Sequence, residues 1–406
     1  MLANPMALKL DLASRGVRLD EAVRQRSELF HLPFGGDSII RRIELVLPED
    51  VWVSVPIEAR LAETSPYVLR TEGEQFRLRR DEQETGVRIV PQPRFYAAAT
   101  RAGLPMWRVG TTYAGYLAIN PAAACRFTPP GMPCRFCSTT ALASDRQDPL
   151  TVDDVIETVH AALTEGAAEF VYFHIGDMGG DDRGVQFIEP YVAAIKKHFD
   201  TLVALQLQPP TSDRWIDRAY AAGADALSYD VEIHDAEVLH RYRGECADPS
   251  RRDRVYDALA YAATIFPSGT VWSDLILGLE PPESTMAGID RLVRTGVLPV
   301  LTVPPRAEDL RPDDRGWSTE SVSQVFAHLF NAVRTAKINM NWIRDLSFAV
   351  TPLEARFFAG DEWRTVSSLT PFYRSRLGTM AARNLARMRR RLRVRKVSDS
   401  FDSSHL

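Results

Sequence analysis

Three of the 4 cysteines in this chain lie within a stretch of thirteen residues, as Cys125, Cys134 and Cys137. Thiolate is the preferred protein ligand of iron–sulfur clusters, and three thiolates on one loop can bind three irons of a cubane cluster. The fourth iron would then stay open to a substrate or cofactor. The spacing therefore predicts a loop that binds a cluster with a reactive iron.

The same spacing also fits other kinds of site. A structural zinc ion is held by four ligands, so zinc would need a fourth ligand from Cys246 or from one of the 8 histidines. No histidine lies inside the cysteine loop, and the next one, His160, falls in an expected helix. Disulfides are not expected, because 4 cysteines in 406 residues are too sparse and residues 1–22 contain no apolar signal segment. Zinc and unligated thiols stay open beside the cluster.

The last two cysteines carry a family resemblance. In Cys134-Arg135-Phe136-Cys137 an aromatic residue precedes the final cysteine, which resembles the second half of the radical S-adenosylmethionine (SAM) motif, Cys-x3-Cys-x-aromatic-Cys. Eight residues, and not three, separate Cys125 from Cys134, and the Pro-Pro-Gly-Met-Pro insert is turn chemistry that suits a bulged loop. The resemblance implies that the three cysteines bind one [4Fe-4S] cluster and that Phe136 packs beside the SAM adenine.

A second stretch, Glu169 to Gly180, is an apolar run that ends in glycines, which is typical of a buried strand running into a tight loop. It resembles the second strand of the radical SAM barrel, whose glycine-rich end receives the SAM amino group. The family's usual Gly-Gly-Glu is absent, so Asp177 or Asp181 would replace its acidic residue. The resemblance implies SAM contacts from Gly176, Asp177, Gly179 and Gly180.

Two further stretches resemble the fourth and fifth strands of that barrel. In Ala226 to Gly244, an acidic residue at the strand end is followed by an arginine next to a glycine, which implies that Glu232 contacts the SAM ribose and Arg243 the SAM carboxylate. A solvated carboxylate at a strand end is the alternative for Glu232. Gly278 ends the next apolar run, where the family's backbone passes along the adenine, and glycine permits such a close approach.

The chain alternates between apolar runs and segments of helical periodicity. Residues 152–163, for example, place Val155, Val159 and Leu163 at helical spacing, with Thr151 as the cap. The strand-like runs cover residues 116–120, 170–175, 202–207, 226–232, 271–278 and 297–303. This alternation predicts an α/β fold with a parallel sheet, and together with the resemblance it predicts a partial (β/α)6 TIM-type barrel. Parallel barrels carry their active sites at the carboxyl ends of the strands, where the predicted site residues fall.

Length and composition indicate a globular protein with more than one part. The chain has 406 residues, of which 45% are hydrophobic, so it exceeds a typical single domain. We expect an N-terminal α+β wrapping region over residues 1–110, a barrel core over 111–307, and a helical extension with a basic tail over 308–406. Within the extension, Thr351 to Phe358 is expected to be a lid or docking segment.

The tail is the strongly basic part of the chain. Eight cations fall within fourteen residues: Arg383, Arg387, Arg389, Arg390, Arg391, Arg393, Arg395 and Lys396. Such a segment can bind RNA, an acidic partner or an anionic membrane. Because the whole chain has a net charge of −4, any nucleic-acid footprint would be local. We expect a solvated helix paired with acidic residues elsewhere, and a radical SAM enzyme that modifies RNA stays an alternative.

The resemblance also implies an activity. SAM would be cleaved reductively to a 5′-deoxyadenosyl radical, with an electron from a flavodoxin or ferredoxin, and the radical would take hydrogen from a small-molecule biosynthetic substrate. Only Cys246 remains outside the loop, so a single cluster is expected. Candidate substrate contacts, chosen by their positions at strand ends, are Tyr172, His174, Gln206, Gln208, His234 and Arg306.

The sequence also indicates a cellular compartment and leaves two alternative roles open. An oxygen-sensitive cluster, with no targeting or membrane-spanning segment in the sequence, indicates the cytoplasm. A zinc-stabilised nucleic-acid- or protein-binding module would need Cys246 or a histidine as fourth ligand. A radical SAM-like scaffold would hold the cluster without cleaving SAM.

Overall fold

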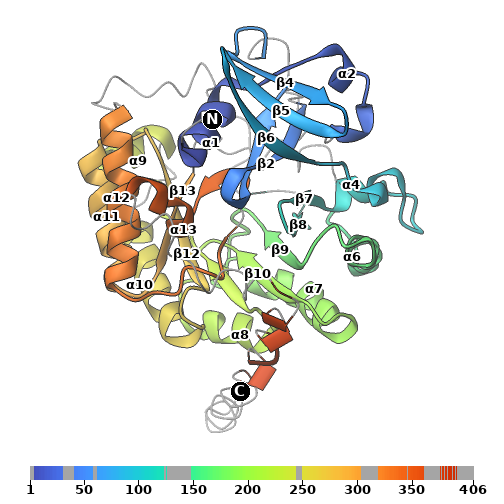
Figure 1. The fold of residues 1–406 in the computed structure, drawn as a ribbon. Coiled ribbons are helices and arrows are strands. Elements are labelled where there is room, and N and C mark those ends of the chain that lie inside the picture. Colours follow the sequence, from blue (N-terminus) through green and yellow to red (C-terminus); the bar gives the residue numbers. More distant parts are fainter. Residues whose placement is uncertain are drawn as a thin grey trace, which may run out of the picture.

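The computed structural model describes most of the chain. The described residues are 4–30, 41–57, 62–122, 125, 148–243, 249–302, 319–344 and 346–360, followed by 375, 377–378, 380–381, 383–385, 387–388 and 390. They form two β-sheets, one near the N-terminus and one in the centre of the chain, with helices packed around the second (Figure 1).

The N-terminal sheet has six strands in the order β1-β4-β5-β6-β2-β3. Its strands are β1 (Arg18–Leu19), β2 (Arg42–Leu47), β3 (Val51–Pro56), β4 (Tyr67–Glu72), β5 (Gln75–Arg80) and β6 (Gln83–Val90). Neighbouring strands are antiparallel except for β1 and β4, and helix α1 (Pro5–Arg15) packs against β3. The short helices of this part are α2 (Glu21–Arg24), η1 (Ser27–Leu29), η2 (Pro48–Asp50), η3 (Arg94–Ala97) and α4 (Met106–Val109).

The second sheet has eight strands in the order β14-β13-β12-β11-β10-β9-β8-β7. They are β7 (Thr111–Tyr113), β8 (Tyr116–Ile119), β9 (Phe170–His174), β10 (Leu202–Gln206), β11 (Ala226–Ser228), β12 (Val271–Ile276), β13 (Leu298–Thr302) and β14 (Ala349–Val350). Strands β8 to β13 are parallel, and the edge strands β7 and β14 pair antiparallel. Because the strand order follows the chain order, the sheet winds in one direction. The predicted α/β partial barrel with six parallel strands is therefore confirmed.

Helices cover the outer face of this sheet (Figure 1). They are α6 (Val152–Glu165), α7 (Val185–His198), α8 (Arg214–Ala222), α9 (Ala236–Arg243), α10 (Pro249–Ile265), α11 (Pro282–Arg294) and α12 (Thr319–Thr335). The Thr151 hydroxyl accepts the Asp154 N–H and caps α6, as the sequence predicts. Alternate strand residues such as Val171, Phe173 and Leu205 are fully buried beneath these helices.

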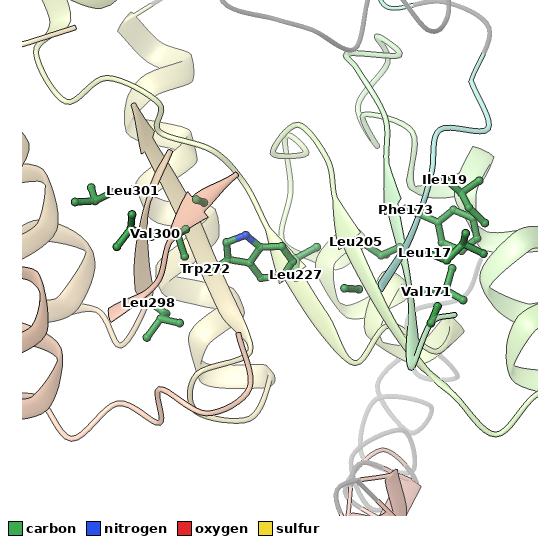
Figure 2. Packing of buried hydrophobic residues seen from close by; sticks show 14 of the residues in the cluster. Leu117, Ile119, Val171, Phe173, Leu205, Leu227, Trp272, Leu298, Val300 and Leu301 are labelled. Carbon is green, nitrogen blue, oxygen red and sulfur yellow. The ribbon is translucent and has the colours of Figure 1, made fainter. Parts of the chain in front are cut away.

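The inner face of the sheet is lined by aromatic side chains. Tyr172 on β9 and Trp272 on β12 have ring centroids 6.0 Å apart, although β10 and β11 separate their strands in the sheet. Two residues so far apart in a sheet can touch only if the sheet curls toward them. Figure 2 shows Trp272 between the side chains of β13 and those of β8 and β9. Tyr116 and Phe170 stack beneath Tyr172, with Tyr116 5.5 Å from each of the two rings.

The chain returns from the barrel to the N-terminal sheet through residues 346–358. Strand β14, helix α13 (Pro352–Ala355) and the turn η6 (Arg356–Phe358) lie in this segment. Lys9 of α1 is buried and donates to Glu354 Oε1 at 2.8 Å and to the Leu346 and Ala349 carbonyls. The Ser347 hydroxyl donates to Glu44 Oε2 of β2 at 2.6 Å. This segment therefore joins the barrel to α1 and β2, and a lid or docking role for residues 351–358 stays a prediction.

Candidate functional site

The carboxyl ends of the parallel strands bring several predicted site residues to one edge of the sheet. Cys125 follows β8, the Gly176–Gly180 loop follows β9, Glu232 follows β11 and Gly278 follows β12. Cys134, Phe136, Cys137, Cys246 and Arg306 lie outside the described residues. The site can thus be described from Cys125 and from the strand ends around it.

Cys125 lies directly against Gly176. A Cβ atom at Gly176 would lie 2.4 Å from the Cys125 Cβ and 2.5 Å from its Sγ, which is closer than real Cβ contacts. Any larger residue at position 176 would therefore push the cysteine away from the strand end. The Asp177 N–H donates to the Cys125 Sγ at 3.2 Å, so the sulfur already acts as an acceptor.

The carboxylate of Asp177 is used by its own loop. Asp177 is 1% exposed, and its Oδ1 accepts the Gly179 N–H at 2.8 Å and pairs with Arg183 Nη1 at 3.2 Å. Gly179 and Gly180 have φ values of 72° and 66°, a left-handed conformation that glycine adopts readily. Asp181, the alternative acidic residue, is exposed. The structure therefore gives Asp177 a loop-stabilising set of contacts.

Glu232 and Arg243 come together as an ion pair. Glu232 Oε1 lies 2.6 Å from Arg243 Nη2. Burial raises the pKa of Glu232, Arg243 opposes that shift, and Asp230 adds to it. Glu232 also has a φ of 61°, which costs about 1–3 kcal/mol for a residue with a side chain, and such strain concentrates at functional sites.

A buried glutamate holds the turn that carries Glu232. Glu280 is fully buried, and its carboxylate accepts the His234 N–H at 3.1 Å, the Asp235 N–H at 2.7 Å and the Ser284 hydroxyl at 2.7 Å. The Glu232 backbone pairs with β12 through Asp274 and Ile276. Glu280 lies two residues after Gly278, and no role was predicted for it from the sequence.

A polar network lines the inner face above the aromatic residues. The Tyr172 hydroxyl donates to Gln206 Oε1 at 2.6 Å, and the Gln206 amide in turn donates to Asp230 Oδ2. The Ser228 hydroxyl donates to Asp230 Oδ1 at 2.6 Å. Tyr172 and Gln206 were both predicted to be substrate contacts, and the structure links them on neighbouring strands.

The network ends in a second aspartate. Asp274 Oδ2 accepts the Thr302 hydroxyl at 3.2 Å. Burial raises the pKa of Asp274 well above its usual value, and the neighbouring Asp230 raises it further. Burial likewise raises the pKa of Asp230. The sequence analysis assigned no role to Asp230 or Asp274, although a charged residue inside the apolar run 271–278 is a detectable signal.

The other predicted substrate contacts do not all join this network. His174 stacks with Tyr172, with ring centroids 5.9 Å apart. His234 Nδ1 instead lies 2.7 Å from the Tyr256 hydroxyl of α10. Burial, with Arg252 and Arg291 nearby, lowers the pKa of His234 to about 4, so it is neutral at pH 7. Gln208 lies two residues beyond β10.

Two kinds of feature are absent from the described residues. Within those residues, no three histidine, cysteine, aspartate or glutamate side chains are grouped so that they could hold a metal ion. None of the described helices is long and apolar enough to cross a membrane. The acidic network is therefore not a metal site formed by these residues alone.

No family model and no curated protein matches the chain. Similar solved structures include HydG, described as a maturase of the [FeFe]-hydrogenase, with 16% identity, a TM-score of 0.42 and coverage of 56% of this chain and 52% of that one. They also include methylornithine synthase (PylB), with 16% identity, a TM-score of 0.41 and coverage of 54% and 64%.

A further similar structure is the FeFe-hydrogenase maturase HydG from Carboxydothermus hydrogenoformans, with 14% identity, a TM-score of 0.43 and coverage of 55% and 52%. The matched part of the chain thus spans 52% to 64% of the length of these three proteins. The TM-score of each of these three likenesses is below 0.5.

Proposed function

We propose that the chain is a radical SAM enzyme that binds one [4Fe-4S] cluster through Cys125, Cys134 and Cys137. The position of Cys125 is the observation that carries the proposal. It lies at the carboxyl end of a parallel half-barrel, where a glycine makes room for it and a backbone N–H donates to its sulfur. A thiolate that accepts an N–H suits the donor set of an iron–sulfur cluster.

The bound cluster would supply the electron that cleaves SAM reductively to a 5′-deoxyadenosyl radical, after delivery from a flavodoxin or ferredoxin. The residues of this chain would bind and orient SAM. Gly179 and Gly180 would face the SAM amino group, and Phe136 and Gly278 would lie beside the adenine. Gly176 and Asp177 would hold Cys125 and the loop in place, which their contacts support.

The Glu232–Arg243 pair would bind the remaining polar groups of SAM. Glu232 accepts hydrogen bonds, which suits the ribose hydroxyls, and the Arg243 guanidinium suits a carboxylate. Arg243 lies 2.6 Å from Glu232, so both groups are held close together before any ligand arrives. The backbone of Glu232 is strained, and Glu280 holds the turn that follows it through hydrogen bonds. Both features support a binding role for this turn.

The substrate would be a small biosynthetic molecule bound against the inner polar network. Tyr172, Gln206, Asp230, Asp274 and Thr302 present hydroxyl, amide and carboxylate groups on one face of the curled sheet. These groups would orient a polar substrate above the aromatic residues. Because a reduced cluster is sensitive to oxygen, we place the enzyme in the cytoplasm.

Anaerobic reconstitution with iron and sulfide tests the proposal. We expect wild-type protein to hold about four irons, as one cubane cluster requires. After dithionite reduction it should form 5′-deoxyadenosine from SAM. The Cys134→Ala variant should lose both properties, whereas Cys246→Ala, the matched control, should keep them. A colourless protein that retains zinc would indicate a zinc-stabilised module instead, and a cluster that never cleaves SAM would indicate a scaffold.

A further inference from the structure

The loop between β9 and α7 contacts Cys125 with its backbone and carries a buried ion pair of its own. We infer that this loop, residues 176–184, sets the reduction potential of the cluster, with Asp177 and Arg183 as positioning residues. The inference rests on the proposed function, since it requires that Cys125 bind the cluster. It also gives a role to Arg183, a residue for which no role was expected from the sequence.

The loop contacts the sulfur of Cys125 directly. The Asp177 N–H donates to the Cys125 Sγ at 3.2 Å, and Gly176 leaves no space for a Cβ between the loop and the cysteine. A backbone donor at this distance is charge-assisted when the sulfur is a thiolate. The loop therefore places a hydrogen-bond donor on a cluster ligand.

Two contacts of the Asp177 side chain hold this N–H donor in place. Asp177 Oδ1 accepts the Gly179 N–H at 2.8 Å, which closes the turn behind the donating N–H. Arg183 Nη1 pairs with the same oxygen at 3.2 Å, with side-chain exposures of 16% for Arg183 and 0% for Asp177. An ion pair shielded from water in this way keeps its geometry much better than an exposed pair. The backbone and the side chain of Asp177 thus connect Arg183 to the cysteine.

The hydrogen bond also affects the reduction of the cluster. Adding an electron to a cluster increases the negative charge on its thiolate ligands. A donated N–H stabilises that charge, so the reduced form gains more than the oxidised form, and hydrogen bonds to sulfur are one of the factors that set cluster potentials. Loss of the Asp177 N–H bond should therefore make the midpoint potential more negative.

Charge alone would also lower the potential if Arg183 were removed, so the variants must separate charge from geometry. Arg183→Met removes a cation together with its ion pair to Asp177. The double variant Asp177→Asn/Arg183→Met removes both charges and leaves the net charge of the loop unchanged. Arg183→Lys keeps the cation. Arg218→Met is the matched control, because Arg218 forms an ion pair with Glu189 on the outer helices, at 2.7 Å.

The test is a redox titration of the full-length, reconstituted protein without SAM, followed by electron paramagnetic resonance. We expect the double variant and Arg183→Met to shift the reduction equilibrium about tenfold toward the oxidised form, or about 59 mV for one electron. Arg183→Lys should restore the wild-type potential, and Arg218→Met should not change it. A purely structural role would lower the iron content without moving the potential of the cluster that forms.

The outcomes separate this inference from the proposed function. If wild type and all variants hold a cluster at the same potential, the inference is wrong and the proposed function stands. If wild type holds no cluster, both are wrong. Should Arg183→Met fail to fold, the double variant Asp177→Asn/Arg183→Met decides the question, because it keeps the net charge of the loop and leaves an oxygen for Gly179. An unchanged potential in that variant also overturns the inference.

Discussion

At the amino end of the barrel, Asp225 pairs with Lys196 and with Arg390, whose Nη2 lies 2.6 Å from Asp225 Oδ1. At the carboxyl end, Asp274 receives the Thr302 hydroxyl and makes no ion pair with any described residue. Both aspartates adjoin parallel strands of one sheet, yet one has two cations and the other a neighbouring acid, Asp230.

The difference indicates that the charges at the amino end stabilise the fold, whereas those at the carboxyl end are suited to binding. Arg390 also donates to the carbonyls of Tyr220, Gly223 and Ala224, so it ties the C-terminal segment to the end of α8. Such a satisfied cluster stabilises the fold. A buried carboxylate that has no cation beside it lowers the stability of the folded protein. Groups with strongly shifted pKa values are typical of sites that bind ligands or catalyse reactions.

Three arginines of the basic tail pair with acidic residues at the amino end of the barrel. Arg383 and Arg387 lie beside Asp200, and Arg390 pairs with Asp225. The prediction that the tail pairs with acidic residues elsewhere is confirmed for these three arginines. The tail's remaining cations lie outside the described residues, so a nucleic-acid contact through them stays a prediction.

The largest effect is expected at the carboxyl end. Gly176→Ala places a methyl group 2.5 Å from the Cys125 Sγ, so the cysteine must move away from the position proposed for cluster binding. We expect most of the bound iron to be lost after reconstitution, as measured by iron analysis. Gly115→Ala is the control, since a Cβ there meets nothing within 4 Å. Equal iron content in both variants would contradict the placement of Cys125 at the cluster.

An intermediate effect is expected at the amino end. Arg390→Ala leaves the buried Asp225 with one cation fewer and removes the hydrogen bonds from Arg390 to three carbonyls, which should cost about 2 kcal/mol of unfolding free energy. Arg387→Ala removes an exposed pair and should cost under about 0.5 kcal/mol. Urea denaturation measures both. Iron content should be unchanged in either variant, and a loss of iron in Arg390→Ala would break the distinction between the two ends.

The smallest effect concerns the pH dependence of stability. The pKa of Asp274 is raised in the folded protein, so the folded state keeps a proton that the unfolded state releases as pH rises above the ordinary aspartate pKa. Stability should therefore fall with rising pH between the unfolded and the folded pKa. Asp274→Asn removes this titration, and urea denaturation from pH 4 to pH 8 should show a shallower decline than in wild type. If stability declined equally with pH in the variant and in wild type, the pKa of Asp274 would not be raised in the folded protein.

Much of the fold could be predicted because strand and helix periodicity are local properties. The apolar run 170–175 became β9, Phe170–His174, and the run 271–278 became β12, Val271–Ile276. Strand ends were less accurate, since the run 226–232 contains only the short β11, Ala226–Ser228, and then Glu232 in a left-handed conformation. Positive φ at a residue with a side chain depends on the contacts that surround it.

The sequence by itself predicted the six parallel strands and the positions of Gly176, Glu232 and Gly278 at strand ends, because each depends on residue type and short-range spacing. The cluster-binding loop stays a prediction, since Cys134 and Cys137 lie outside the described residues. The tertiary structure decided which charges meet. Arg183 is paired with Asp177, Arg243 with Glu232 and Arg390 with Asp225, and Asp274 is left beside Asp230. Arg183 and Asp177 lie on one loop, whose turn brings them together. Arg243 and Arg390 lie on other elements than their acidic partners, and the packing of the chain around the sheet brings those pairs within reach.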